Sequence, residues 1–212
     1  QGGLAFGRQF YVGINGSSWG VTAGRQYTPQ NLAVATFEPL GGGYWGHMNA
    51  QAAGSYEALG SAPGDGTYQL TQRADNSILL TLNGSPWTGR LMVGAGNENT
   101  RGTGRLVNAS VVYDQGPLQA TVSVLRMKQA AGMITATAEP EPLSQWTTAV
   151  KYDLGVAKLF AGYMQYTGPK NPANLSTAAT LGATGAAAQA YSWKKNRSAW
   201  VGASVPMPVG QT

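Results

Sequence analysis

Short segments in which apolar and polar residues alternate recur along the whole chain. In residues 106–114 the odd positions are Val, Ala, Val and Tyr, whereas Asn108 and Ser110 occupy the other face. Residues 118–128 have the same period of two, with Thr121 and Ser123 on the polar face. Because successive side chains of a β-strand point to opposite faces, this period predicts strands with one apolar face. The predicted strands are residues 6–15, 20–29, 75–83, 90–98, 106–114, 118–128, 145–153, 157–167 and 197–209.

The connections between these segments alternate between two kinds. Four are short and rich in turn-forming residues, namely NGSSWG, NGSPWTG, QGP and LGV. The others, residues 30–72, 99–105, 129–144 and 168–196, are longer on the whole. In an up-and-down antiparallel sheet every second connection lies at the same edge. The pattern therefore predicts a meander of nine strands, with short turns at one edge and long loops at the other.

Composition narrows the class of protein. Charged residues make up 11% of the chain, against roughly 25% in an ordinary soluble domain. Hydrophobic residues make up 42% and the net charge is +5, which excludes a disordered chain. The basic residues are scattered, so no nucleic-acid partner is expected. There is no Cys, and the single His47 has no evident partner ligands, so we expect no metal and no cofactor.

Strand length and aromatic residues favour a membrane β-barrel over a soluble β-sandwich. Strands of about ten residues suffice to cross the hydrocarbon layer when tilted, and they exceed the usual length in soluble sheets. Aromatic residues that lie near strand ends are typical of the two membrane borders. Alternation alone fits a sandwich equally well, with the aromatic residues in its core. The aromatic residues concerned are Tyr27, Trp87, Tyr113, Trp146, Tyr152 and Tyr166.

Several strings carry a family resemblance, and they occur in one order along the chain. QGGLAFGRQFYVGING, GVTAGRQYTP, RADNSI, VVYDQGPLQATVSV, VKYDLGVAKLFAGY and WVGASVPMPVG resemble the trimeric general porins of Gram-negative outer membranes, in particular the β-proteobacterial type. The resemblance implies an all-β fold, a transmembrane antiparallel up-and-down barrel of sixteen strands. The strands here resemble the fourth to the twelfth, so the resemblance predicts a fragment of a barrel. It also implies a homotrimer, contact with outer-membrane lipid and lipopolysaccharide, and passive diffusion of ions and small hydrophilic solutes without enzymatic activity.

The resemblance further implies an inward-folded loop that narrows the pore, and residues 30–72 correspond to it. The acidic residues of this connection are Glu38, Glu57 and Asp65. Glu38, in FEPLGGG, resembles the acidic residue that the family presents at the constriction. The alternative for each of these residues is a carboxylate on a solvated loop.

Opposite this loop the family places wall arginines; Arg8 and Arg73 match those positions, and Arg25 is a third, weaker candidate. A guanidinium remains charged in almost any environment and binds carboxylates and other anions well. The alternative is that each arginine is a strand-end residue that anchors to lipid phosphate. Alternation leaves a second question open, because Arg8 faces the lumen only if Tyr11 faces outward, and otherwise Gln9 is the lumen residue.

The balance of charge predicts a mild preference for anions. Arg90 and Lys151 join the three arginines above, so that cations outnumber acids on the predicted strands. One alternative function is a substrate-specific porin, with a stripe formed by Tyr44, Trp45, Tyr56 and Tyr68. An alternative of a different class is a soluble β-sandwich adhesin that binds glycans.

Overall fold

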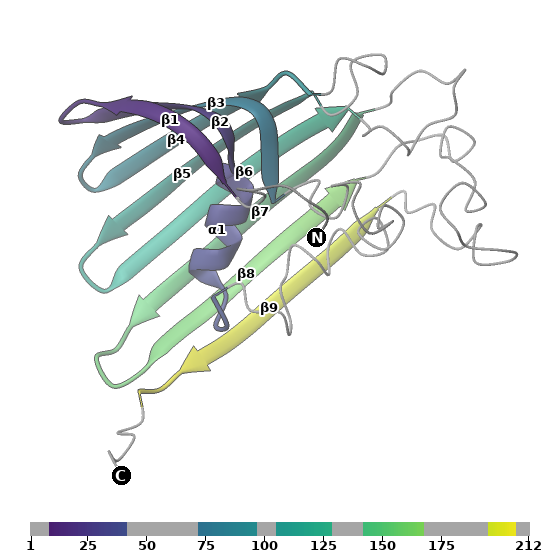
Figure 1. Ribbon diagram of the computed structural model, residues 1–212. Helices are drawn as coiled ribbons and strands as arrows, with labels where there is room; N and C mark the ends of the chain where they lie inside the picture. Colours follow the sequence, from purple (N-terminus) through teal and green to yellow (C-terminus); the bar gives the residue numbers. More distant parts are fainter. Residues whose placement is uncertain (1–8, 42–71, 97–104, 129–141, 168–194, 207–212) are drawn as a thin grey trace, which may run out of the picture.

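The computed structural model describes residues 9–41, 72–96, 105–128, 142–167 and 195–206. These residues form one antiparallel sheet of nine strands, in which each strand pairs with the next one along the chain (Figure 1). The meander predicted from the sequence is therefore confirmed. Its strands are β1 (Phe10–Asn15), β2 (Trp19–Tyr27), β3 (Arg73–Gly84), β4 (Trp87–Gly94), β5 (Leu106–Gln115), β6 (Leu118–Lys128), β7 (Pro142–Asp153), β8 (Lys158–Thr167) and β9 (Asn196–Ser204).

The two edges of the sheet differ as the sequence predicted. Four tight turns join β1 to β2, β3 to β4, β5 to β6 and β7 to β8 at one edge, here called the turn edge. At the turn between β5 and β6, Gly116 has φ of 59°, a conformation that glycine adopts without strain. The longer connections join the strands at the opposite edge, here called the loop edge, and most of their residues lie outside the described ranges. The loop edge and the turn edge thus lie at opposite ends of every strand.

Strand boundaries differ from the prediction mainly where residues expected in a turn form backbone hydrogen bonds of the sheet. β4 begins at Trp87, three residues before the predicted start, because Gly84 and Trp87 pair directly across a turn of two residues. β7 begins at Pro142, and β9 ends at Ser204 rather than at residue 209. The predicted first strand is described only from Gln9 onward, and β1 begins at Phe10.

One helix, α1 (Pro29–Phe37), was not predicted, and it occupies the start of residues 30–72, which were expected to form an inward-folded loop. It follows β2 directly and lies on the concave side of the curved sheet (Figure 1). It contacts strands β4 to β8, with most of its contacts to β5, β6 and β7. Within the described ranges, no helix combines the length and the apolar character needed to cross a membrane. The rest of the predicted constriction loop, from residue 42 to residue 71, lies outside the described residues.

The two faces of the sheet have the opposite polarity to those of a soluble protein. On β5 the polar Asn108 is 0% exposed, whereas Val107 and Val111 are 52% and 48% exposed. On β6, Ser123 is 0% exposed and Val122 is 53% exposed. The concave face thus holds buried polar residues under α1 as well as a buried apolar cluster that includes Met92, Leu125 and Leu143, and exposed apolar residues cover the convex face. A sheet that exposes its apolar face is suited to contact with lipid, and it is not the half of a soluble sandwich.

The exposed apolar side chains of the convex face form a continuous band, here called the apolar belt. Three aromatic residues, Trp87, Tyr113 and Tyr152, border it on the convex face at the turn edge, and the rings of Trp87 and Tyr113 are 4.8 Å apart. Two of the predicted border aromatics lie elsewhere: Tyr166 is 2% exposed in a cluster on the concave face, and Tyr27 lines a hollow described below. The belt comprises Ile78, Leu82, Leu91, Val93, Val107, Val111, Val122, Val124, Val150 and Val201.

The belt gives a direct test of its contact with lipid. A charge at the middle of a lipid-facing strand costs about 2–4 kcal/mol, and the cost falls to about 0–1 kcal/mol near the membrane borders. We expect Val122→Arg, in the middle of the belt, to lower the free energy of unfolding by the larger amount. The matched control is Ser144→Arg, which lies on the same face at the loop edge and should cost little. Reversible urea unfolding of the full-length protein in phospholipid vesicles measures both, and equal costs for the two variants would contradict the assignment.

Candidate functional site

The start of α1 is fixed by local sequence. Thr28 is the N-cap, and its hydroxyl oxygen accepts a hydrogen bond of 3.1 Å from the backbone N–H of Asn31. Pro29 occupies the first helical position, where its missing N–H costs nothing. The backbone N–H of Thr28 donates to the carbonyl oxygen of Gln72 at 2.9 Å, which ties the helix start to the strand β3. The helix therefore leaves β2 in a defined direction across the concave face.

A polar seat holds the N-terminal half of α1 against the wall. The backbone N–H of Gln30 donates to Oδ1 of Asn108 at 2.7 Å, and its side-chain amide donates to the hydroxyl of Thr147. Asn108 is itself oriented by donating to the carbonyl oxygen of Val124 at 2.8 Å and to the hydroxyl of Ser123 at 3.2 Å. Gln30, Asn108 and Thr147 are all fully buried. Because buried polar groups are costly when unpaired, these bonds fix the position of the helix.

The C-terminal half of α1 is held by apolar packing and one hydrogen bond. Val34 and Phe37 pack with Met164 and Trp200, and the indole N–H of Trp200 donates to the carbonyl oxygen of Phe37 at 3.0 Å. The ring of Trp200 lies over Gly162, where a Cβ atom would overlap the ring. Glycine on β8 thus leaves the space in which Trp200 reaches the helix.

Trp200→Phe tests this anchor. The variant keeps an aromatic ring over Gly162 but removes the only donor that reaches the Phe37 carbonyl among the described residues. We expect α1 to be held less firmly by about 1–3 kcal/mol, and the backbone amides of α1 in the full-length protein to exchange hydrogen with solvent correspondingly faster. Trp87→Phe, on the convex face, is the matched control and should leave the exchange of α1 unchanged. Equal exchange in the two variants would contradict a role of Trp200 in anchoring α1.

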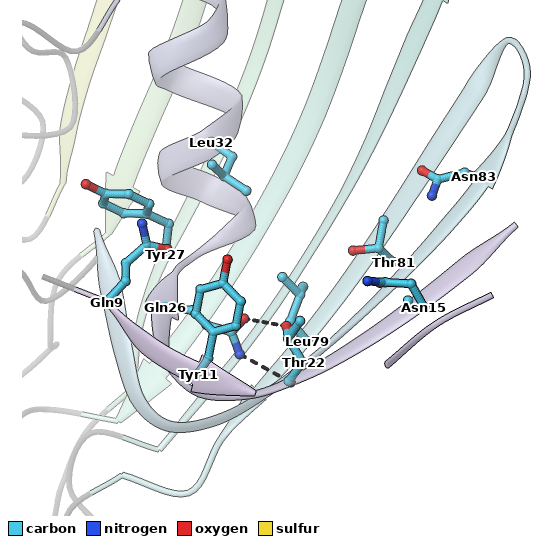
Figure 2. Close-up of a pocket in the computed structure, with 11 residues that line it drawn as sticks. Gln9, Tyr11, Asn15, Thr22, Gln26, Tyr27, Leu32, Leu79, Thr81 and Asn83 are labelled. Atoms are coloured by element: carbon cyan, nitrogen blue, oxygen red, sulfur yellow. Dashed lines mark hydrogen bonds between the residues drawn. The ribbon is translucent and has the colours of Figure 1, made fainter. Parts of the chain in front are cut away.

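Beside α1 the concave face holds a hollow of about 410 Å³ (Figure 2). Strands β1, β2 and β3 form its wall, and Leu32 of α1 closes one side. No charged side chain is among the 11 residues that line it. Gln26 is kept in place by accepting from the Thr22 hydroxyl and by donating to the Ser77 hydroxyl at 3.2 Å. The polar lining consists mainly of Gln9, Asn15, Thr22, Gln26, Thr81 and Asn83.

The hollow also answers the question of which face of the first strand points inward. Gln9 and Tyr11 line the hollow, whereas Phe10 and Val12 are 65% and 73% exposed on the convex face. Of the two alternatives left open by the sequence, the structure therefore places Gln9 on the concave face. Arg8 lies outside the described residues.

Two cations lie on the concave face of strands that α1 contacts. Arg90 on β4 is half-buried and pairs across strands with Thr81, which lines the hollow. Lys151 is on β7, with Nζ 5.8 Å from the centre of the Phe37 ring. The described concave strands carry a third cation, Lys158, and two carboxylates, those of Asp114 and Asp153, near the turn edge. Asp153 and Lys158 form an ion pair of 3.7 Å. The charge of the described wall is therefore slightly positive.

Arg73, one of the predicted constriction residues, lies where β2 and β3 meet at the loop edge. It pairs across strands with Tyr27, and its guanidinium lies 4.8 Å from the centre of that ring. Nη2 of Arg73 also donates to the Tyr27 hydroxyl at 3.2 Å. Because Tyr27 lines the hollow, Arg73 lies beside the described part of the wall that faces α1.

Arg25 is placed differently from the expectation. It pairs across strands with Phe10, whose side chain is on the convex face, and it forms an ion pair with the exposed carboxylate of Asp75. A bulge between Gly24 and Gln26 shifts the register beside it. Arg25 therefore points away from α1, and it is not grouped with Arg73.

Among the predicted acids, Glu38 is the one within the described residues. It is the C-cap of α1 and is 3% exposed, and its backbone N–H donates to the carbonyl oxygen of Val34 at 3.0 Å. It therefore lies at the end of α1 in a buried position. Glu57 and Asp65, as well as the aromatic residues of the possible stripe, Tyr44, Trp45, Tyr56 and Tyr68, lie outside the described residues.

The described ranges contain no group of three or more His, Cys, Asp or Glu side chains arranged to hold a metal ion. The residues that matter most for the geometry, Gln30, Asn108, Thr147 and Trp200, were not among the predicted site residues. Gln30 and Trp200 lie more than a hundred residues apart in sequence. Only the packing of α1 on the sheet brings Gln30 to Asn108 and Thr147, and Phe37 to Trp200. The sequence signal that was available is the pair Thr28-Pro29, which is typical of a helix start.

Comparison with known proteins agrees with this geometry. A solved structure titled as the anion-selective porin from Comamonas acidovorans matches 77% of this chain and 47% of its own, with a TM-score of 0.62 and 23% identity. The outer-membrane-expressed OmpT of Vibrio cholerae matches 75% of this chain and 47% of its own, with a TM-score of 0.49 and 15% identity. Outer membrane porin protein 32 of Delftia acidovorans is 27% identical over 174 residues, which cover 78% of this chain and 45% of that relative.

The chain thus spans about half the length of the curated relative that it matches. The nine described strands, with the apolar belt on the convex face and α1 on the concave face, have the fold of an open part of a porin β-barrel. A family model for the Gram-negative porins matches residues 1–212. The chain therefore belongs to the Gram-negative porin family.

Proposed function

We propose that the protein forms a water-filled channel for the passive diffusion of ions and small hydrophilic solutes across the outer membrane. The observation that carries this proposal is the inverted polarity of the sheet, with Asn108, Ser123 and Thr147 buried on the concave side and Val111 and Val122 exposed on the convex side. A polar inner wall beside an uncharged hollow offers a route for water and hydrated solutes. The helix α1, which lies on that wall, narrows the route.

The channel favours anions mildly in this proposal. Arg90 and Lys151 lie on the concave face of strands that α1 contacts, and together with Lys158 they outnumber the two carboxylates of the described strands on that face, Asp114 and Asp153. A fixed excess of positive charge raises the local concentration of anions in a narrow, water-filled passage. The matching solved structure is titled as an anion-selective porin, which supports the same preference.

Arg73, Glu38, Glu57 and Asp65 remain the proposed constriction residues, and Gln9 takes the place of Arg8, because Gln9 and Tyr11 line the hollow. Arg73 has the strongest support, because it stacks over Tyr27 at the border of the hollow. Arg25 is the weakest member of the predicted set, since its ion pair with Asp75 lies on the convex face.

The proposal further includes a homotrimer, contact of the convex face with outer-membrane lipid and lipopolysaccharide, and a transport role without catalysis. Membership of the porin family supports each of these. The exposed apolar belt supports the contact with lipid in particular, because a band of this kind requires an apolar surrounding.

Reconstitution of the full-length porin into planar bilayers tests the function. We expect stepwise increases in current as single channels insert, and a zero-current potential in a KCl gradient with the sign of anion preference. Clear cation preference would contradict the selectivity, and a failure to form channels would contradict the function itself. A protein that stays monodisperse without detergent would return the soluble adhesin to consideration.

A further inference from the structure

Three glycines of the concave face lie in the wall of the hollow beside α1. Each pairs across strands with a residue that lines the hollow, and a Cβ atom at its position would overlap that partner. Because the glycines have no side chain, their partners can lie close to the sheet, and the space above them stays open. The hollow is therefore built into these strands. The pairs are Gly13 with Thr22, Gly20 with Asn15, and Gly24 with Tyr11.

One end of the hollow is lined by neutral hydrogen-bonding groups. Asn15 and Thr81 lie in one row across the strands, on either side of Gly20. Asn83 follows Thr81 on the same face of β3, and Figure 2 shows these three side chains at the same end of the hollow. Asn15 and Asn83 are exposed and Thr81 is partly exposed, so a ligand in the hollow can reach their amide and hydroxyl groups. Each of these groups can donate as well as accept a hydrogen bond.

The middle of the hollow is more apolar. Leu79 of β3 lines it from the wall and Leu32 lines it from the helix, while Tyr11, which is 50% exposed, adds an aromatic ring (Figure 2). Toward the loop edge the lining becomes polar again, with Gln26 and Tyr27. Hydrogen-bonding groups thus lie at both ends of a partly apolar surface.

This lining matches a sugar better than an ion. None of the described residues that line the hollow is charged, so the lining offers an ion no opposite charge. The hydroxyl groups of a sugar donate and accept hydrogen bonds, and the C–H faces of its ring pack against apolar and aromatic side chains. On β1 the lining extends from Gln9 to Asn15, which is about 20 Å of extended strand. A length of this kind suits a short linear chain of sugar rings.

We propose that the hollow binds a short, uncharged oligosaccharide, whose hydroxyl groups are held at one end by Asn15, Thr81 and Asn83. The ring faces pack against the apolar middle of the hollow. The inference rests on the proposed function, since the hollow lies on the face that the proposed channel encloses. Arg73 and Arg90 pair with lining residues but do not themselves line the hollow, so the sugar and anions use different parts of one wall.

Calorimetric titration of the full-length porin with cellotriose measures this binding without any need for conduction. The porin is kept in a detergent without a sugar headgroup. We expect saturable binding that is the same at low and high KCl, because the sugar has no charge that salt could screen. A hydrogen bond contributes about fivefold to affinity, so Asn15→Leu with Thr81→Val should weaken binding roughly 25-fold.

Two control variants and a second probe sharpen the result. Asn15→Gln with Thr81→Ser keeps the donors and acceptors and should retain most of the affinity. Gln119→Leu removes an amide from the concave face outside the hollow and should bind as the wild type does. Polyethylene glycol of the same mass, which has only ether acceptors along its length, should not bind saturably. Wild-type affinity in the Leu and Val double variant would overturn the site, as would loss of binding at high KCl or saturable binding of polyethylene glycol.

Recording in planar bilayers separates this inference from the proposed function. Cellotriose should reduce the current of wild-type channels saturably, over the same concentrations at which it binds in the titration. A porin that bound cellotriose through Asn15 and Thr81 but formed no channels would contradict the function and leave the sugar site standing. A porin that formed channels but bound no cellotriose would overturn the site and leave the function standing.

Discussion

Asn108→Leu is expected to release the N-terminal half of α1 from the wall and to raise the conductance of the channel. Leucine has the same branching as asparagine, with somewhat larger terminal groups, but it removes the acceptor of the Gln30 backbone N–H and leaves that group buried without its partner. It also removes the bonds that Asn108 donates to Ser123 and Val124. Among these losses, only that of the Gln30 bond distinguishes the seated from the displaced helix, and it costs about 1–3 kcal/mol. The population of channels with α1 displaced should therefore rise by about one to two orders of magnitude.

Single-channel recording of the full-length porin in planar bilayers measures the conductance, and swelling of proteoliposomes in solutions of graded sugars measures the size limit for solutes. Ser110→Ala is the matched control, because Ser110 is buried on the same face of β5 but its hydroxyl has no hydrogen bond in the structure. It should keep the wild-type conductance and size limit. If Asn108→Leu also kept both values, α1 would not be the element that narrows the channel.

The double variant Arg90→Glu with Lys151→Glu is expected to reverse the ion selectivity. Both cations lie on the concave face beside α1, so the change replaces two positive charges by two negative ones along the proposed route of the ions. Fixed charges in a narrow, low-dielectric passage concentrate their counter-ions, and a change of this size exceeds the slight positive excess of the described wall. The zero-current potential in a KCl gradient should change sign.

The matched control is a double variant that changes the net charge by the same amount on the convex face of the sheet. Arg126→Glu with Lys128→Glu lies on the convex face, outside the proposed route, and should keep the wild-type potential. The neutral variant Arg90→Gln with Lys151→Gln should give an intermediate value. An equal effect of the concave and convex pairs would mean that overall charge, and not the position of Arg90 and Lys151, sets the selectivity.

The strands were predictable because the information for them is local. The period of two in segments such as 118–128 and the turn residues Gly116 and Pro117 are sufficient to place β5 and β6 and their shared edge. The helix α1 was missed although its boundaries are marked in the sequence, by Thr28-Pro29 at the start and by Pro39 after the C-cap. It contains only nine residues and lies in a stretch that a family resemblance presents as a loop.

The site was less predictable than the strands, because it depends on which residues meet across the sheet. Alternation separates Asn108 from Val107, but it does not say which face is concave until α1 is placed. The bulge between Gly24 and Gln26 puts Arg25 beside Asp75, and neither the bulge nor the ion pair has a signal in the spacing of the residues. Likewise, the stacking of Arg73 on Tyr27 joins residues that are 46 positions apart.

The inverted polarity of the sheet also has a consequence for how the sequence tolerates substitution. Lipid chains are fluid and fill any shape, so the exchange of one aliphatic residue for another at Val111 or Val122 meets no rigid neighbour. The polar residues under α1 fit their partners at hydrogen-bond distance, so that even a small change at Asn108 or Thr147 leaves a donor or an acceptor unmatched. In this protein the aliphatic positions of the convex face are therefore the freely interchangeable ones, and a few small polar residues fix the place of α1 on the concave face.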